Sequence, residues 1–319
     1  MKPDSARTRV YRHRAFTGHD TTPHPENPSR VIAIDAELQR RGLLHDRPAP
    51  VWEPASDEQI LRVHDARLLS SLKQLVASGG GAIDPDTIVF PDSLDVARLA
   101  AGAGIHAVEA IAAGEATTAA VLGRPPGHHA TKVRSMGFCL LNTVAITAAH
   151  ALATGFQRVA VIDWDVHHGN GTQDIFYDRA DVLFCSSHRY GRYFYPGTGA
   201  ASERGTGAGT GFTVNIPLTM GDGDAAITAA LEQRILPAVR SYQPDLILIS
   251  AGFDAHIEDP LGGLRVTDEG FRNLALRTRD LSRELTGGRL IAMLEGGYHP
   301  VASARCVADM IEVLDTPSP

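Results

Sequence analysis

Acidic side chains and histidines alternate in one short stretch of the chain. Asp163, Asp165 and His167 directly follow the apolar run Val-Ala-Val-Ile. Side chains two residues apart point the same way in an extended segment, so this stretch can present two carboxylates and an imidazole together. Two aspartates at this spacing are more often a turn or a helix cap, but three ionisable groups buried at a strand end without a cation would be costly. The stretch therefore predicts a metal site.

Asp254 stands at the end of another apolar run and offers a further carboxylate to the same site. Two carboxylates and one imidazole suit Zn²⁺ or a neighbouring divalent ion such as Fe²⁺, because these ligand types alone do not select between them. Three protein ligands leave one coordination position for water, as catalytic sites require. This pattern favours hydrolysis by a metal-activated water.

A pair of adjacent histidines, His128 and His129, follows a stiff Pro-Pro-Gly turn. A histidine close to a metal-bound water is suited to proton transfer near neutral pH, although adjacent histidines in loops are also common as exposed chance pairs. Asp163 and Asn170 are available to orient the two rings. Tyr298, which follows Glu-Gly-Gly, could donate its phenol to an oxyanion or could simply pack at the edge of the core.

The elements that must position these residues alternate between strands and helices. Apolar runs rich in β-branched residues, typical of buried parallel strands, lie at 119–122, 159–162, 182–185, 246–250 and 290–294. Ala- and Leu-rich helical patterns lie near 93–113, 139–154, 223–242, 267–286 and 301–314. This alternation predicts a parallel sheet with helices on both faces. Binding residues of such sheets lie just beyond the carboxyl ends of the strands, which is where the candidate residues fall.

Composition narrows the class of protein. The chain has 319 residues, 43% of them hydrophobic, and no linker-like stretch, so we expect one domain over 1–319 with loose ends at 1–8 and 316–319. The net charge of -7 argues against a nucleic-acid partner. The chain has three cysteines and no C-x-x-C pair, which favours a reducing compartment. It contains no apolar run of about 18 residues and no signal-peptide core. We therefore expect a soluble, cytoplasmic protein without a membrane partner.

The longer motifs resemble the histone deacetylase family, particularly its class II branch and the bacterial deacetylase-like amidohydrolases. They are H-P-E-N-P-S-R, R-P-P-G-H-H-A, G-F-C-L-L-N, D-W-D-V-H-H-G-N-G-T-Q-D-I-F, P-G-T-G, A-G-F-D-A-H, D-P-L-G-G and L-E-G-G-Y, and they span nearly the whole chain. The resemblance implies an arginase-like three-layer α/β sandwich around a mostly parallel eight-stranded sheet. It also implies a zinc-dependent amidohydrolase that removes an acetyl or other acyl group from an amine, most directly from acyl-lysine in a protein or peptide.

The resemblance also assigns roles to single residues. The positions that match the zinc ligands are Asp165, His167 and Asp254. His129 matches the general base and acid, with Asn170 beside it, and His128 matches the electrostatic partner, with Asp163 beside it. Tyr298 matches the residue that polarises the carbonyl and stabilises the oxyanion.

Further positions follow from the same resemblance. A structural potassium ion near the zinc would use Asp163, Asp165, His167, Ser186 and Ser187, and a second, peripheral one would lie near Phe176, Arg179 and Val182. The substrate-contacting positions are Gly137, Phe138, Tyr195, Leu261 and Asp86, the last of which could equally cap a turn. This chain departs from the usual family pattern at three places, with a tyrosine in the tunnel wall at Tyr195, Asn170 instead of the aspartate of many class I members, and His299-Pro300 after Tyr298.

Three alternatives share some of these features. An acetylpolyamine amidohydrolase has the same metal site, but Leu261 stands where one polyamine-selective group has glutamate, which favours acyl-lysine over an acylated small amine. A ureohydrolase needs two manganese ions, and His256 replaces a carboxylate that such a site would use. A catalytically silent acyl-group sensor commonly loses the tyrosine or a ligand, whereas this chain keeps them. The resemblance leaves the oligomeric state open, a homo-oligomer included.

Overall fold

All five predicted strands lie together in one parallel sheet of the computed structural model, which describes residues 7–47 and 49–316. They are β4 (Thr118–Val121), β5 (Val159–Asp163), β6 (Val182–Arg189), β8 (Leu246–Ala251) and β9 (Leu290–Leu294). Two edge strands complete the sheet, β1 (Arg9–Tyr11) and β7 (Thr213–Leu218), in the order β1-β4-β9-β8-β5-β6-β7. All neighbouring strands run parallel.

The expected count of eight strands is wrong, because the sheet has seven within the described residues. Beyond it, pairing at His256–Val266 and Gly223–Arg265 is limited to isolated bridges that do not extend into a strand. Both edge strands escaped prediction for physical reasons. β1 spans three residues, and β7 alternates buried with partly exposed positions and contains Pro217, as edge strands tolerate.

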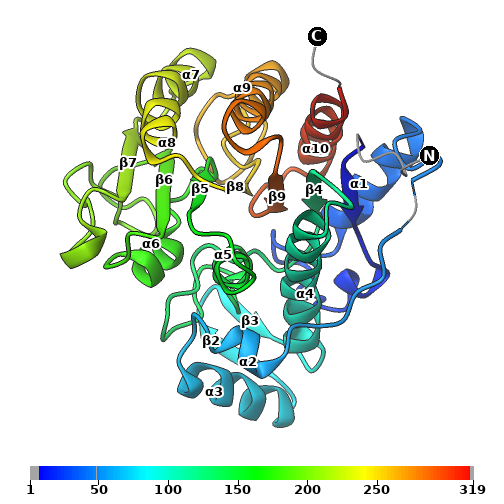
Figure 1. Cartoon of the computed structure of the whole chain (residues 1–319). Helices are drawn as coiled ribbons and strands as arrows, with labels where there is room; N and C mark the ends of the chain where they lie inside the picture. Colours follow the sequence, from blue (N-terminus) through cyan, green and yellow to red (C-terminus); the bar gives the residue numbers. More distant parts are fainter. Residues whose placement is uncertain (1–6, 48, 317–319) are drawn as a thin grey trace.

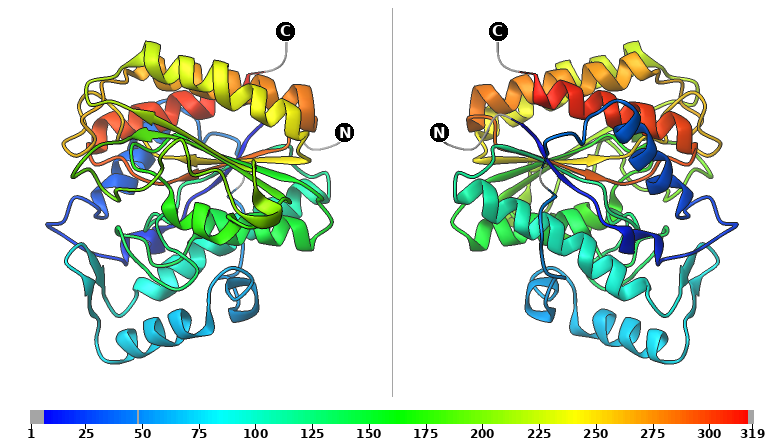
Figure 2. Two further views of the ribbon diagram at one scale, coloured as in Figure 1. Left: turned by 90° about the vertical axis from the view of Figure 1, so that its left-hand side faces the viewer. Right: turned by 90° about the vertical axis from the view of Figure 1, so that its right-hand side faces the viewer.

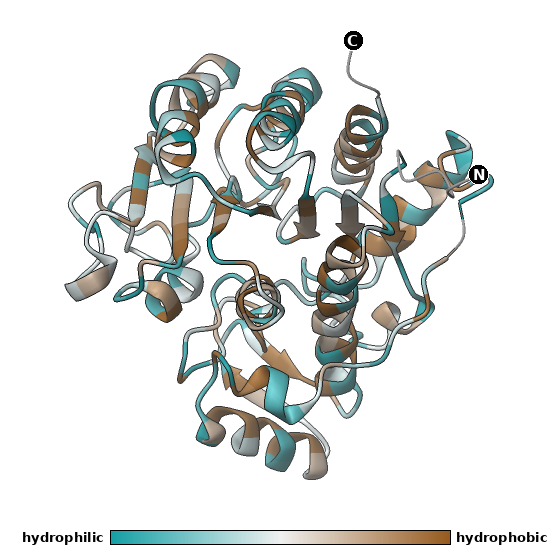
Figure 3. Cartoon of the chain, viewed as in Figure 1, coloured by the Kyte–Doolittle hydropathy of each residue, from teal (hydrophilic) through white to brown (hydrophobic). Residues whose placement is uncertain are grey.

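Helices cover both faces of the sheet, as predicted (Figure 2). One face carries α1 (Ser29–Arg40), α7 (Asp224–Ala230), α8 (Leu236–Tyr242), α9 (Asp268–Thr286) and α10 (Pro300–Asp315) (Figure 1). The other carries α4 (Ser93–Ala112), α5 (Thr143–Ala153) and α6 (Asn170–Phe176). Successive residues of β5 point to opposite faces of the sheet. Ile162 packs in the hydrophobic core beneath the first group of helices, and Val161 packs in the core beneath the second group. Burial on both faces explains why these strands read as continuous apolar runs, coloured brown in Figure 3.

Two predicted helices have different limits in the structure. Asn142 accepts a hydrogen bond from Ala145 N (3.0 Å), so α5 begins at Thr143 and not at 139. The helical stretch predicted at 223–242 contains a π-helical segment, Leu231–Ile235, between α7 and α8. Helices α1 and α6 lie outside the predicted helical ranges. So does a group of elements beside α4 (Figure 1), which comprises α2 (Asp57–Ile60), α3 (Ala66–Ala77) and the antiparallel hairpin of β2 (Gly81–Asp84) with β3 (Thr87–Val89).

One residue of the ends predicted to be loose, Thr8, is packed against the fold. Thr8 is buried, and its N–H donates to Asp315 Oδ1 (2.8 Å) at the end of α10. Residues 1–6 and 317–319 lie outside the described residues. Among the helices within 7–47 and 49–316, none has the length and apolar character required to cross a membrane.

Candidate active site

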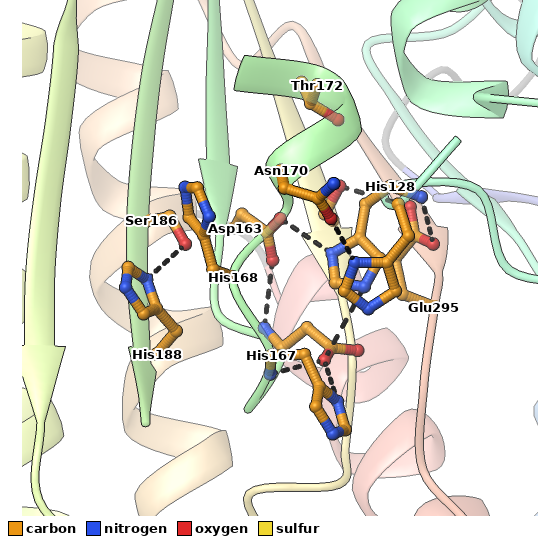
Figure 4. Close-up of polar contacts among 12 residues, drawn as sticks. His128, Asp163, His167, His168, Asn170, Thr172, Ser186, His188 and Glu295 are labelled. Atoms are coloured by element: carbon orange, nitrogen blue, oxygen red, sulfur yellow. Dashed lines mark hydrogen bonds and ion pairs between the residues drawn. The ribbon is translucent and has the colours of Figure 1, made fainter. Parts of the chain in front are cut away.

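The carboxyl ends of four neighbouring strands bring the predicted site residues together. His128 and His129 follow β4, Asp165 and His167 follow β5, and Asp254 follows β8. Figure 4 shows His128 and His167 close together. The Glu-Gly-Gly-Tyr segment, which ends at Tyr298, follows β9. The positional prediction is therefore confirmed.

The stretch after β5 differs from the extended segment that was expected. Asp163 Oδ1 accepts a hydrogen bond from Asp165 N (3.1 Å), and Asp165 Oδ1 accepts one from His167 N (2.9 Å). These two successive aspartate turns bend the chain. Asp165 and His167 still meet, but Asp163 turns to His128 instead of joining them.

Asp165, His167 and Asp254 form one compact cluster. Their ligand atoms all lie within 4.8 Å of one another, and His167 Nδ1 is 3.2 Å from both Asp165 Oδ1 and Asp254 Oδ2. Both carboxylates are fully buried. Each is held by a backbone donor: Val166 N binds Asp254 Oδ1 (2.8 Å) and Gly296 N binds Asp165 Oδ2 (2.8 Å). These contacts fix the carboxylates before any ligand arrives.

The electrostatics of this cluster favour a cation. Burial and the neighbouring charge of Asp165 raise the pKa of Asp254 to about 7. Burial lowers the pKa of His167, but hydrogen bonds with both carboxylates outweigh it and raise that pKa to about 9. Two buried carboxylates this close together need a positive charge beside them, which protonated His167 supplies in the metal-free protein. A divalent ion can supply that charge instead, and His167 then loses its proton because an imidazole that binds a metal is neutral. The donor set and its burial fit Zn²⁺.

The two adjacent histidines have different partners. His128 Nδ1 lies 2.9 Å from Asp163 Oδ2, and His129 Nδ1 lies 2.7 Å from Asn170 Oδ1. The Asn170 amide has its nitrogen against Met136 Sδ (3.6 Å), which leaves its oxygen to accept from His129. His129 Nδ1 therefore carries the proton, and its Nε2 has the free lone pair.

These partners separate the pKa values of the two rings. Burial lowers the pKa of His128, but the charges of Asp165 and Asp163 outweigh it and hold the pKa well above its usual value. Burial and the positive charges of His128 and His167 hold the pKa of His129 well below its usual value. His128 is therefore the ring that favours the protonated form, and His129 is the ring that favours the neutral form.

A cavity of about 120 Å³ opens onto these groups. It is lined by all the predicted substrate positions and three site residues: Asp86, Gly137, Phe138, Tyr195, Leu261, His129, His167 and Tyr298. The Phe138 and Tyr298 rings meet edge to face at 5.6 Å, and the Tyr195 ring stands 5.0 Å from that of His129. Asp84, and not Asp86, caps the β2–β3 turn, because its Oδ1 accepts from Asp86 N (3.0 Å).

Two residues that support the site were not singled out in the sequence. Glu295 is fully buried, and its carboxylate accepts hydrogen bonds from Gly127 N (2.6 Å) and His128 N (3.1 Å). It therefore holds the backbone of the loop that carries His128 and His129 (Figure 4). Arg30 donates to Gly297 O (2.7 Å), and its guanidinium lies 5.0 Å over the Tyr298 ring. The sequence indicates a role for these two residues only by their charge within a motif: Glu295 precedes Gly-Gly, and Arg30 follows Asn-Pro-Ser.

The remaining predicted positions lie further from the cavity. Asp163 on β5 pairs in register with Ser186 on β6, next to Ser187. Arg179 lies with its guanidinium 5.2 Å over the Phe176 ring, shortly before Val182 begins β6. His256 contacts Asp268 Oδ1 (2.9 Å) and belongs with Asp268 and Cys306 to a group separate from Asp165, His167 and Asp254. It therefore adds no ligand for a second metal ion beside those three residues.

Comparisons with known proteins agree with this geometry. A model of the histone deacetylase domain matches residues 24–314. The histone deacetylase-like amidohydrolase of Pseudomonas aeruginosa is 42% identical over 295 residues, which cover 91% of this chain and 77% of that protein. The polyamine deacetylase HDAC10 of Homo sapiens is 39% identical over 300 residues, which cover 91% of this chain and 44% of that protein. A crystal structure of the HDA15 HD domain matches with a TM-score of 0.93 at 36% identity, covering 98% of this chain and 90% of that chain.

The matched segment contains the Asp165–His167–Asp254 cluster, the histidine pair and Tyr298. It also contains six of the seven sheet strands, since only β1 precedes residue 24. The resemblance drawn from the motifs is thereby confirmed, and the chain belongs to the histone deacetylase family.

Proposed function

We propose that this protein is a zinc-dependent amidohydrolase that removes an acetyl or other acyl group from the lysine side chain of a protein or peptide. One observation carries the proposal: the Asp165–His167–Asp254 cluster, the neutral His129 and Tyr298 line or adjoin the same cavity. The names of the relatives, a deacetylase-like amidohydrolase among them, support the same reaction class.

Each residue would contribute to the reaction in a defined way. When bound there, the divalent ion supplies Lewis acidity, which polarises a carbonyl group and acidifies water. His129 Nε2 takes the proton of the attacking water, because its Nδ1 is engaged by Asn170. Protonated His128 adds positive charge close to the developing negative charge. The Tyr298 hydroxyl donates to the carbonyl oxygen as it becomes negative, and His129 passes its proton to the leaving amine.

We also propose a structural potassium ion beside this centre, held by Asp163, Asp165, His167, Ser186 and Ser187, partly through backbone oxygens. The register pairing of Asp163 with Ser186 supports it, because that pairing places oxygen donors on adjacent strands. The second, peripheral potassium near Phe176, Arg179 and Val182 stays a prediction.

An acetylated polyamine is the second candidate substrate. Asp86 at the cavity wall could attract a cationic amine, and a polyamine deacetylase is among the relatives. Leu261, which is 39% exposed at the same cavity, supplies no charge and favours the neutral stem of acyl-lysine.

A substrate panel on metal-quantified enzyme tests the proposal. We expect hydrolysis of acyl-lysine peptides with a higher kcat/KM than acetylated polyamines, and inhibition by a hydroxamate that chelates the metal. A reversed preference would select the polyamine alternative. Binding of acyl-lysine without any turnover of either substrate would identify a silent sensor and reject the hydrolase.

The Gly137→Ala variant tests the cavity wall. Gly137 has φ +57°, and an added Cβ would lie 2.6 Å from His129 Cδ2 and 2.7 Å from Tyr195 Oη. Both distances are too short, so both side chains or the backbone at residue 137 must move, and a shift of about 1 Å near a catalytic group can lower activity by about 10²-fold. Steady-state kinetics measure the effect.

Gly42→Ala is the matched control. Gly42 has φ +69°, close to that of Gly137, but nothing lies within 4 Å of its added Cβ. It carries the same backbone penalty without the steric contact, so it should keep wild-type kinetics. Equal kinetics in the two variants would show that the wall tolerates the extra carbon.

A further inference from the structure

The carboxylate of Asp259 connects two parts of the cavity wall. Its Oδ2 accepts a hydrogen bond from Tyr298 N (2.7 Å). Its Oδ1 accepts from Leu261 N (2.8 Å) and Gly262 N (3.1 Å), which forms the turn that presents Leu261 to the cavity. One half-buried side chain thus holds both the rim and the tyrosine.

Tyr298 depends on such an anchor because its own segment is conformationally free. It follows two glycines, and Gly297 has φ +122°. The segment is tied down by Gly296 N on Asp165 Oδ2, Arg30 on Gly297 O and Asp259 on Tyr298 N. Of these three contacts, the one from Asp259 is made to the backbone of Tyr298 itself. A small backbone rotation there displaces the hydroxyl at the far end of the ring.

We propose that Asp259 is a positioning residue, which sets the Tyr298 backbone against the Leu261 turn so that the hydroxyl reaches the reacting carbonyl oxygen. The inference rests on the proposed function, since it acts through the role given there to Tyr298.

Asp259→Asn separates the two contacts of the carboxylate. An asparagine side chain has a single acceptor oxygen, and we expect it to take the position of Asp259 Oδ1, where Leu261 N and Gly262 N both donate to it. The NH₂ group then takes the position of Oδ2 and faces Tyr298 N, which is also a donor, so no hydrogen bond can form there. The turn persists and the Tyr298 contact is lost. We expect kcat to fall about tenfold, less than removal of the tyrosine hydroxyl itself costs, while KM changes less than about twofold because the rim is kept.

A double-mutant cycle with Tyr298→Phe distinguishes positioning from general stability. If Asp259 acts through the Tyr298 hydroxyl, Asp259→Asn should lower kcat by less than about twofold when that hydroxyl is already absent. Asp259→Ser is the second variant, because its hydroxyl can cap the turn but is too short to reach Tyr298. It should give the same coupling if Asp259→Asn folds poorly.

Asp245→Asn is the matched control. Asp245 is also half-buried, and its Oδ2 accepts from Gln157 N (2.8 Å) and Arg158 N (2.9 Å) at the amino-terminal ends of β5 and β8, opposite to the strand ends that carry the site. It should lower the melting temperature without changing kcat. Equal loss from Asp259→Asn in both backgrounds, or no loss in either, would overturn the inference. Absence of turnover in the wild type would instead reject the proposed function.

Discussion

The Asp254→Ala variant is expected to retain almost no divalent metal and to show no hydrolysis above background. Asp254 is one of two fully buried carboxylates in the cluster, and its Oδ2 lies 3.2 Å from His167 Nδ1. Without it one carboxylate and one imidazole remain, fewer than the three protein ligands that catalytic zinc sites use. Metal analysis after dialysis against trace zinc, with a peptide hydrolysis assay on the same sample, measures both effects.

Thermal melting adds a reading that does not depend on activity. A ligand that binds only the folded state raises its stability, so zinc should raise the melting temperature of the wild type but not that of Asp254→Ala. The pKa of Asp254 is raised to about 7 by burial and by Asp165. Ionisation of this carboxyl therefore opposes folding, and its own contribution to the stability of the metal-free protein should fall as the pH rises from its unfolded pKa, about 4, toward 7. The stability of wild type minus that of Asp254→Ala measures this contribution, because other buried groups, such as His19 and His64 with pKa values lowered to about 4, titrate in both proteins.

Asp268→Ala is the control for this experiment. Asp268 belongs to a second group of ligand-type residues, with His256 and Cys306. There Arg305 already supplies the positive charge, since its Nε lies 3.0 Å from Asp268 Oδ2. This variant should keep its metal and its kcat. Stoichiometric metal in Asp254→Ala, or loss of metal in Asp268→Ala, would contradict the ligand assignment.

The parts of this fold that could be predicted are those whose local sequence is determined by burial. β5 and β8 are buried on both faces and therefore appear as unbroken apolar runs. β7 has an alternating pattern broken by Pro217, and β1 is too short to show any period. The number of strands consequently could not be obtained from apolar runs alone.

The same distinction applies to the site. The residues from Asp163 to His167 are neighbours in sequence, so their cooperation was visible, although the turns that bend them were not. Contacts between distant segments gave no local signal. Arg30 reaches Gly297 across 267 positions, and Asp259 reaches Tyr298 across 39. Such contacts depend on the order of strands in the sheet, which no single segment encodes.

Tyr298→Phe should lower kcat by about 10²–10³-fold, which is typical for the loss of one oxyanion donor. KM and metal content should change little, because the ring still packs against Phe138 and beneath Arg30. Burial holds the pKa of the Tyr298 phenol well above its usual value, against the opposing charge of Arg30. The hydroxyl therefore stays protonated as a donor, and the loss should be the same at every pH at which the wild type is active. Single-turnover kinetics across that range measure it.

The control must remove a buried phenol elsewhere, because loss of a hydroxyl can also act through stability. Tyr242→Phe does so, since Tyr242 donates to Ala180 O (3.0 Å) near the amino-terminal end of β6, whereas the cavity lies beyond the carboxyl ends of the strands. It should cost about 1 kcal/mol of stability and leave kcat unchanged. The two variants together separate catalysis from folding. Tyr298→Phe should lower kcat and leave the free energy of unfolding unchanged, whereas Tyr242→Phe should lower the free energy of unfolding and leave kcat unchanged. Near-normal turnover in Tyr298→Phe would show that the oxyanion is stabilised without this hydroxyl, and the positioning role of Asp259 would then fail with it.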